Sequence, residues 1–349
     1  MLAIIFFVVL VSCEKEEEIG FTAGFNYEFV DDNNVKFNNT SEGEYYSVEW
    51  DFGNGETIET TERNKTYTIY YPLAGDYNIS ISVLNFAGEV KREEQTVTIL
   101  ADDPEYIPNS DKLIWSDEFN GAFVNSSNWT FETGANGWGN NELQNYTNGD
   151  NVEVQNGKLI ITAKKVNDSQ TVGSYTSTRI ITKDKQEFTY GKIEVRAKLP
   201  AGRGIWPAIW MLGANFDNAG WPACGEIDIM EYVGYEPNTI HSTVHTSAGY
   251  GGESNGSSKT LETAEEEFHV YGLIWNENEL IFYTDDPTNV THRYAPVSKT
   301  TQNWPFNKPQ FFIFNIAVGG NWGGAEGIDN TIFPQTMEID YVRVYKIDS

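Results

Sequence analysis

Three carboxylates stand within six residues of one apolar segment, Gly225–Tyr232, whose sequence is GEIDIMEY. In a β-strand, alternate side chains share a face, so Glu226 and Asp228 point the same way. Glu231 would face the opposite side of a regular strand, but a β-bulge at Ile229–Met230 adds the one residue that returns it. The segment therefore predicts three acids along one face, the arrangement that a retaining glycoside hydrolase needs for its nucleophile and general acid.

The pattern alone leaves two other interpretations of these acids open. Acidic alternation on a strand is common where one sheet face is solvated, and carboxylates are also the ligands that Ca²⁺ takes. The apolar residues between the acids and the Trp- and Gly-rich sequence around them favour a sugar cleft instead. Sugar rings stack their apolar faces on aromatic side chains, as other apolar groups do.

The GEIDIME sequence resembles the active-site signature of glycoside hydrolase family 16, in the bulged form found in laminarinases. Further segments resemble this family in chain order, so the resemblance covers residues 111 to 347. It implies an all-β fold: a catalytic β-jelly-roll sandwich of two curved antiparallel sheets, with the cleft across the concave sheet. The matching segments are Leu113–Gly121, Gly137–Gln144, Tyr175–Ile180, Gly204–Leu212, Asn315–Trp322 and Ile339–Tyr345.

The resemblance implies a role for each acid: Glu226 as the nucleophile, Glu231 as the general acid/base and Asp228 as the supporting acid. Spacing alone leaves Glu226 and Glu231 interchangeable, and only the resemblance orders them. Three carboxyls this close cannot all ionise freely, so at least one is expected to keep a proton near neutral pH. That proton is the one a general acid donates.

Two tryptophans are the first candidates for holding a sugar. Trp206 and Trp210 are four residues apart, so an extended strand places both on one face as a stacking surface. A core position for Trp210 is the alternative. Other tryptophans stand in loop-like sequence flanked by Gly or Pro, where cleft rims are built. These rim candidates are Trp138, Trp221 and Trp322.

Two polar residues fall in segments that match the family's cleft, and one histidine outside those segments is a further candidate. Asn141 and Arg179 are expected to hydrogen-bond sugar hydroxyls, and His245 has either a cleft role or a structural one. A zinc site of His241 and His245 is disfavoured, because the spacing suits a helix and this stretch has the pattern of a strand.

The resemblance also implies a structural Ca²⁺ on the convex face, while the chemistry itself needs no cofactor. Its expected ligands are Glu118, the carbonyl of Gly157 and Asp340, since Ca²⁺ prefers hard oxygen donors. An exposed position in an alternating strand is the other explanation for Asp340.

The net charge narrows the class of partner. With 23 basic and 51 acidic residues the chain carries a formal charge of −28. Nucleic acid is excluded as a partner because binding it needs a basic face, and sulfated or uronic polysaccharides would be repelled. A neutral β-glucan polysaccharide is the expected partner, and the protein is expected to be a monomer.

The N-terminal residues resemble a lipoprotein signal. The apolar run from Leu2 to Val11 is too short to span a bilayer, and Leu10–Cys13 resembles a bacterial lipobox, although no Lys or Arg precedes the run. We therefore expect a signal peptide at 1–12, lipidation of Cys13, and an acidic tether at 13–20. The membrane would be contacted only through this lipid anchor, at the surface of a Gram-negative outer membrane. A simple secretory signal is the alternative.

The remaining sequence divides into two domains. Residues 21–100 alternate polar and apolar positions, and the WDFGNG sequence at Trp50–Gly55 resembles that of a PKD domain, a small immunoglobulin-like β-sandwich. Asn-Gly suits a tight hairpin. Residues 101–110, with two prolines and three acids, form a linker, and 111–347 form the catalytic domain.

The sequence thus predicts a retaining endo-β-1,3-glucanase that hydrolyses laminarin-type glucans. A mixed-linkage β-1,3-1,4-glucanase and an agarase of the same family are the nearest alternatives. A non-catalytic glycan-binding lipoprotein is the alternative from another class, and the three acids argue against it.

Overall fold

The computed structural model describes residues 20–103, 106 and 112–347. The chain divides into two compact units, Met1–Pro108 and Asn109–Ser349, and the division falls within the predicted linker. The signal peptide at 1–12 and the tether, except for its last residue, lie outside the described residues. No helix in the described part of the chain is long and apolar enough to cross a membrane.

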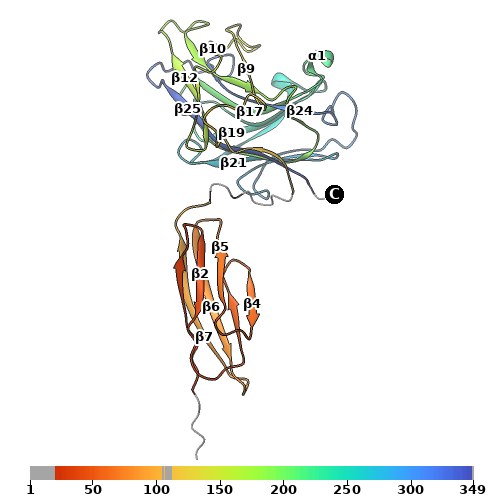
Figure 1. Cartoon of the computed structure of the whole chain (residues 1–349). Coiled ribbons are helices and arrows are strands. Elements are labelled where there is room, and N and C mark those ends of the chain that lie inside the picture. Colours follow the sequence, from red (N-terminus) through yellow and green to blue (C-terminus); the bar gives the residue numbers. More distant parts are fainter. Residues whose placement is uncertain (1–19, 104–105, 107–111, 348–349) are drawn as a thin grey trace, which may run out of the picture. The chain divides into compact units, whose positions relative to one another are not determined.

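The N-terminal unit is a sandwich of two small antiparallel sheets (Figure 1). One sheet has the order β1-β2-β5 and the other β4-β3-β6-β7. The rings of Trp50 and Phe52, from the WDFGNG segment, are fully buried and stack with centroids 5.4 Å apart. The strands are β1 (Phe25–Phe29), β2 (Asn34–Asn39), β3 (Ser47–Asp51), β4 (Thr57–Thr60), β5 (Thr66–Tyr70), β6 (Gly75–Leu84) and β7 (Val90–Ile99).

The C-terminal unit is also a two-layer β-structure, as predicted. Its ten-stranded sheet has the order β10-β13-β12-β25-β16-β21-β22-β23, with β11 beside β12 and β8 beside β25. The strands are β8 (Leu113–Asp117), β10 (Gln144–Tyr146), β11 (Val152–Gln155), β12 (Lys158–Lys165), β13 (Tyr175–Ser177), β16 (Gly191–Lys198), β21 (His269–Trp275), β22 (Leu280–Thr284), β23 (Val290–Tyr294) and β25 (Gln335–Tyr345).

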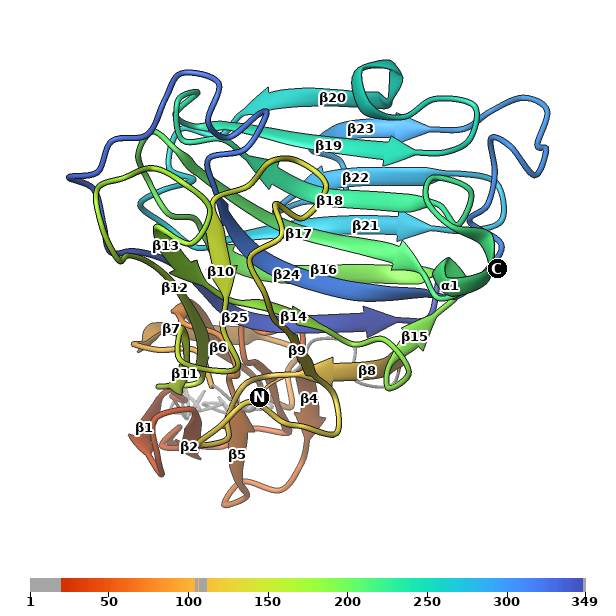
Figure 2. The same ribbon diagram turned by 90° about the horizontal axis from the view of Figure 1, so that it is seen from above.

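The eight-stranded sheet of this unit has the order β20-β19-β18-β17-β24-β14-β9, with β15 beside β24. Figure 2 shows β20, β19, β18, β17 and β24 following one another across this layer. The strands are β9 (Thr130–Glu132), β14 (Arg179–Ile181), β15 (Glu187–Phe188), β17 (Ile205–Gly213), β18 (Glu226–Tyr232), β19 (Thr239–His245), β20 (Asn255–Thr260) and β24 (Gln310–Val318). A four-residue helix, α1 (Phe216–Ala219), follows β17.

One face of the eight-stranded sheet is buried and the other is lined by polar and aromatic residues. On β19 the burial alternates strictly: Ile240, Ser242 and Val244 are buried, while His241 and His245 are partly exposed. The buried residues join a core shared with the ten-stranded sheet. Because the period of a strand is two, this packing turns the alternate side chains onto the open face.

Candidate active site

A β-bulge in β18 brings the three acids onto one face, as the sequence predicts. On the β19 side, Asp228 pairs with Thr243 and Glu231 with His241, and the register shifts between the two pairs. On the β17 side the register also shifts, between the partners of Met230 and Asp228. One extra residue therefore lies between the acids on β18, and Glu226, Asp228 and Glu231 all face the same cleft.

The cleft lies along the open face of the eight-stranded sheet and has a volume of about 1310 Å³. Its lining reaches from Ser257 on β20 to Glu132 on β9, so it crosses the strands of the sheet. Compact small-molecule sites commonly occupy ~300–1,000 Å³. This larger, elongated space suits a chain of several sugar rings.

Each glutamate of the cluster receives a hydrogen bond from an indole. Trp221 Nε1–H donates to Glu226 Oε2 over 3.0 Å, and Trp206 Nε1–H donates to Glu231 Oε1 over 3.1 Å. A hydrogen bond to a carboxylate favours its ionised form. An indole thus orients each glutamate and leaves its other carboxyl oxygen for chemistry.

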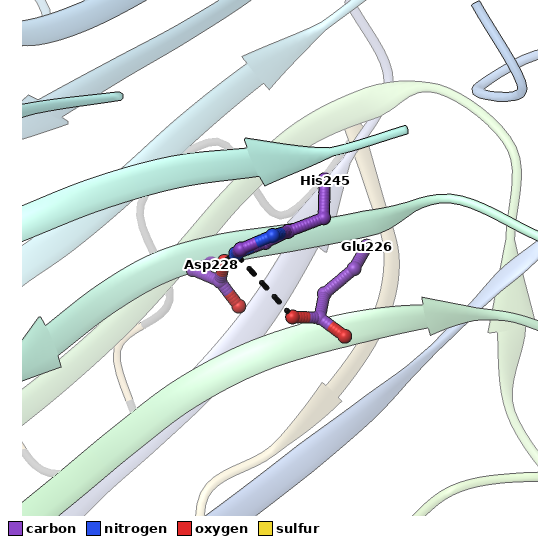
Figure 3. A group of neighbouring side chains, drawn as sticks. All are labelled: Glu226, Asp228 and His245. Atoms are coloured by element: carbon purple, nitrogen blue, oxygen red, sulfur yellow. Dashed lines mark ion pairs between the residues drawn. The ribbon is translucent and has the colours of Figure 1, made fainter. Parts of the chain in front are cut away.

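Asp228 lies between the glutamates and is 3 % exposed. Its Oδ2 is 3.3 Å from His245 Nε2, although the geometry is not that of a hydrogen bond. Glu226 Oε1 is 3.7 Å from the same nitrogen. Figure 3 shows the three side chains turned toward one another.

The backbone sets the tautomer of His245. The Gly251 N–H donates to His245 Nδ1 over 3.1 Å, so the proton of a neutral ring must lie on Nε2, the nitrogen that faces Glu226 and Asp228. Ligand atoms of these three residues lie within 4.8 Å of one another, close enough to hold a metal ion. A protonated Nε2 cannot ligate a metal, so the arrangement is better described as an N–H beside two carboxyls than as a metal site.

Burial dominates the titration of the cluster. It raises the pKa of Glu226 and of Glu231 to about 8, and the charge of Asp228 acts in the same direction. Burial also raises the pKa of Asp228 well above its usual range. The indole hydrogen bonds oppose these shifts. The cluster therefore retains protons near neutral pH, and its titration belongs to the three groups together.

The comparisons with known proteins agree with this site. The family model of the glycosyl hydrolases family 16 matches residues 139–343, and the PKD domain model matches residues 21–98. The chain belongs to glycoside hydrolase family 16. Its C-terminal unit is therefore a glycoside hydrolase, and its N-terminal unit a PKD domain.

Relatives within family 16 cover the catalytic unit. A "Beta-glucanase" of Rhodothermus marinus is 43% identical over 246 residues, which are 67% of this chain and 85% of that protein. The crystal structure of a laminarinase from Flavobacterium sp. UMI-01 shares 47% identity with a TM-score of 0.63, covering 67% of this chain and all of that one. SCLam, a non-specific endo-β-1,3(4)-glucanase, shares 42% identity with a TM-score of 0.62, covering 70% and 94%.

Trp206 and Trp210 both face the family 16 cleft, as predicted. They do not form one open stacking surface, however. The Trp206 ring meets Trp322 edge-to-face at 5.4 Å. The guanidinium of Arg179 lies 4.8 Å from the Trp210 ring and 4.9 Å from that of Trp138. Arg179 therefore lies between two tryptophans in the cleft wall. Cation–π attraction to both rings stabilises its charge among these aromatic residues.

The structure places the three rim tryptophans in the cleft but not Asn141. Trp138, Trp221 and Trp322 line the cleft, and Trp221 is 44% exposed, as a rim residue should be. Asn141 is exposed and outside the lining; its amide donates to Asn321 instead. Asn140 lines the cleft in its place. The positive φ of 57° at Asn141 marks a turn there, and a turn breaks the alternation from which a facing is inferred.

Several cleft residues were not predicted from the sequence, and two of them show why. His241 lines the cleft, with its Nε2 3.2 Å from Glu236 Oε2. The signal was present: in a strand, residues four apart share a face, so His241 must accompany His245. Glu132 lies beside the Arg179 guanidinium, 2.5 Å from its Nε. Only the pairing of β9 with β14 brings these two together, and the sequence does not give that pairing.

The predicted calcium ligands lie in or directly beside strands of the ten-stranded sheet: Asp340 is in β25, and Glu118 follows β8. Gly157 is in the turn between β11 and β12, and Leu159 pairs with Ile339, next to Asp340. Oxygen donors of this kind suit Ca²⁺. In the structure, however, the Glu118 carboxylate pairs with Arg343 and Asp340 pairs with Arg196. Calcium at these residues stays a prediction, and the ion would have to compete with both arginines.

Proposed function

We propose that this family 16 enzyme is a retaining endo-β-1,3-glucanase that hydrolyses laminarin-type β-glucans. The observation that carries the proposal is the bulge in β18, which turns Glu226, Asp228 and Glu231 into one extended cleft. A cleft that crosses the sheet accepts the middle of a polysaccharide, whereas a pocket accepts an end. This favours internal cleavage of the chain.

In the proposed reaction, a Glu226 oxygen attacks the anomeric carbon while Glu231 donates its proton to the departing glycosidic oxygen. The product of this step is a covalent glycosyl-enzyme. Glu231, now ionised, then removes a proton from water, which attacks the same carbon and frees Glu226. Two displacements at one carbon restore the original configuration.

The surrounding groups support both steps. Trp221 Nε1–H orients Glu226 and favours the ionised form that attacks the sugar, and Trp206 Nε1–H fixes the direction in which Glu231 presents its other oxygen. Asp228 is buried 3.3 Å from His245 Nε2, and its raised pKa makes it a further site at which the cluster holds a proton. A nearby carboxyl raises the affinity of Glu231 for its proton, as a general acid requires.

The choice of substrate rests on the relatives and on charge. The Flavobacterium enzyme is a laminarinase, and the Rhodothermus relative is a "Beta-glucanase". A net charge of −28 disfavours anionic polysaccharides and leaves neutral glucans as the expected substrate. A mixed β-1,3(4) specificity is the second candidate, favoured by the similarity to the non-specific SCLam.

A product profile tests the proposal. The purified chain should release reducing sugar from laminarin in preference to lichenan, and none from agarose. Comparable rates on laminarin and lichenan would favour the second candidate, and no release from either would refute both. Proton NMR of the first products should show the β-anomer, since retention follows from the covalent intermediate.

We also propose how the enzyme is placed in the cell. Lipidation of Cys13 would tether a monomeric protein to the outer membrane, with its PKD domain between the tether and the enzyme. Glucan fragments would then be released beside the cell. A structural Ca²⁺ at Glu118, Gly157 and Asp340 completes the proposal, and a higher melting temperature in calcium than in chelator would support it.

A further inference from the structure

Three large apolar side chains are exposed together at one end of the PKD domain. Tyr46 is 53% exposed, Phe86 71% and Val90 61%. The Tyr46 and Phe86 rings are 5.8 Å apart. Val90 pairs across the hairpin with Leu84, whose carbonyl accepts the Tyr46 N–H over 2.7 Å. We call Tyr46, Phe86 and Val90 the hairpin-tip cluster.

This cluster lies at the end of the domain where the described chain begins. Phe86 is in the turn that joins β6 and β7, the two longest strands of this unit. The next residue after the cluster, Lys91, donates to the Phe21 carbonyl and lies 4.6 Å from the Phe21 ring. Figure 1 shows the β6–β7 turn and the first strand's entry at one end of the unit. The hairpin-tip cluster therefore lies close to Phe21, near the first described residue, Gly20.

The length of chain before Gly20 limits how far this end can lie from Cys13. Six residues, Glu14–Ile19, separate Cys13 from Gly20. At ~3.6 Å per residue, the seven intervening steps span roughly 25 Å at most. An acyl chain on Cys13 would therefore hold the hairpin-tip cluster within reach of the bilayer surface.

We propose that the hairpin-tip cluster inserts into the lipid surface to which the protein is tethered. The inference rests on the lipid anchor that forms part of the proposed function. Exposed apolar clusters mark interaction sites, since a monomer gains by covering them. Phe and Tyr suit the boundary between headgroups and acyl chains, where one end of a ring is apolar and the other wet.

The geometry favours lipid over a glucan chain. The Tyr46 and Phe86 rings meet at an angle of 69°, edge against face, so they offer no shared flat surface for consecutive sugars. Lipid has no such requirement, because acyl chains conform to any apolar shape.

Two arginines near the cluster are paired with acids. Arg92 lies 2.9 Å from Glu94, and Arg63 lies 3.7 Å from Glu44. The Asn85 side chain donates to Glu89. Lys91, next to the cluster, contacts the neutral carbonyl and ring of Phe21. Because phosphatidylcholine carries no net charge, one such cation adds little attraction, and the contact should be apolar and insensitive to salt.

Insertion of the tip would give the tether a second membrane contact. Stable anchoring generally takes more than one signal, such as a second chain or an inserted apolar surface. It would also restrict rotation of the PKD domain about its short N-terminal connection, because two points of attachment define an axis.

A fluorescent label at the tip tests the proposal in the lipidated protein. Phe86→Cys supplies the reactive thiol, because Cys224 is buried and Cys13 is consumed by lipidation. An environment-sensitive fluorophore is attached, and the protein is reconstituted into phosphatidylcholine vesicles. The matched control is Asn54→Cys, in the β3–β4 turn, which lies at the opposite end because β3 runs away from Tyr46.

The label at position 86 should shift to the blue and be severalfold less accessible to aqueous iodide than the label at 54, in low and high salt alike. Equal accessibility at both positions would overturn the proposal. So would a blue shift at 86 caused by laminarin alone, which would mean sugar binding. A shift at 86 with dimer formation in sedimentation, before vesicles are added, would mean a second copy and would also overturn it.

Mass spectrometry of the N-terminal peptide keeps the two proposals separate. Acyl groups on Cys13 without a shift at position 86 would support the anchor and refute insertion. If Cys13 carries no acyl group, the anchor is wrong, and the Cys13→Ser variant, labelled at position 86 and mixed with vesicles, still decides insertion. A shift at 86 would then support it, and the absence of one would refute it.

Discussion

The indole Nε1 of Trp206 lies 3.1 Å from Oε1 of Glu231, so a wall residue of the sugar cleft is also a direct donor to the proposed general acid. Trp206 belongs to β17, where Ala208 and not Trp206 is the register partner of Glu231. The contact therefore runs along the diagonal that long side chains on neighbouring strands can span. This hydrogen bond couples the cleft wall at Trp206 to the proposed general acid, Glu231.

Replacing Trp206 by Phe should move the alkaline limb of the pH–rate profile to higher pH. The indole favours the ionised form of Glu231 and so lowers its pKa. Without that donor the pKa rises above about 8, and the acid stays protonated to higher pH. We expect kcat to fall on the order of tenfold, because the acid loses its orientation.

The matched control for this prediction is Trp210→Phe. Trp210 donates its indole N–H to Asn315 over 2.8 Å instead of to an acid of the cluster. Its loss should change KM and leave the alkaline limb in place. A limb that moves equally in both variants would contradict the coupling.

Glu226→Gln should abolish turnover and leave glucan binding intact. The amide keeps the shape of the side chain but cannot form the glycosyl-enzyme, so the loss should reach several powers of ten in kcat. Glu153→Gln, at an exposed position of β11, is the control and should be fully active. Activity within tenfold of the parent would refute the assignment of Glu226.

Azide rescue orders the two glutamates, which spacing cannot do. With Glu226→Ala, azide should take the place of the missing carboxylate and attack the anomeric carbon of the substrate. This single displacement inverts the configuration and gives an α-glycosyl azide. With Glu231→Ala, azide should attack the glycosyl-enzyme and give the β-glycosyl azide. The opposite stereochemistry would exchange the roles. NMR of the isolated azides measures the outcome.

Glu231→Gln should stabilise the protein at pH 8 more than at pH 5. Burial raises the pKa of Glu231 from 4.5 to about 8, so within that window the folded state binds a proton that the unfolded state has lost. The parent's stability must therefore fall as pH rises from 4.5 to about 8. A neutral amide avoids this loss, and we expect a gain of ~1–3 kcal/mol at pH 8. Urea unfolding at both pH values measures it, and an equal gain at both would contradict the linkage.

Deleting residues 21–100 should leave hydrolysis of soluble laminarin nearly unchanged. The catalytic unit has its own core, and every residue that lines the cleft belongs to it. The comparison is kcat for the full chain and the shortened one, with circular dichroism to confirm folding. A large fall in kcat with the fold intact would mean that the PKD domain shapes the cleft.

Cys13→Ala should move the protein out of the membrane fraction. The variant keeps the apolar segment but cannot accept an acyl chain, and without an anchor it should be found in the periplasm or the medium. Fractionation with antibody detection measures the distribution. If the variant still sediments with membranes, or if the mature protein begins elsewhere than at Cys13, the lipoprotein prediction is wrong.

The sequence determined the chemistry on β18. Alternation along the strand places the side chains of Glu226 and Asp228 on one face. Glu231 reaches the same face only if the strand contains one extra residue, so the sequence spacing predicted the bulge that the structure has. The motif order also identified the family, because signature segments keep their spacing whatever the details of the loops. The same alternation placed Trp206 and Trp210 on one face, but it left a core position open for Trp210 and a structural role open for His245; the structure places all three in the cleft lining.

Tertiary structure alone decided which distant groups meet. The donation from Trp221 to Glu226 and from Gly251 to His245 comes from loops, whose path depends on packing and not on any period. Loop packing is also the reason that Asn140 lines the cleft, where the sequence predicted Asn141. Burial also decided the pKa of about 8 at Glu226 and Glu231, since desolvation depends on everything packed around a carboxyl. A sequence specifies which acids share a face; only the fold specifies how much water they lose.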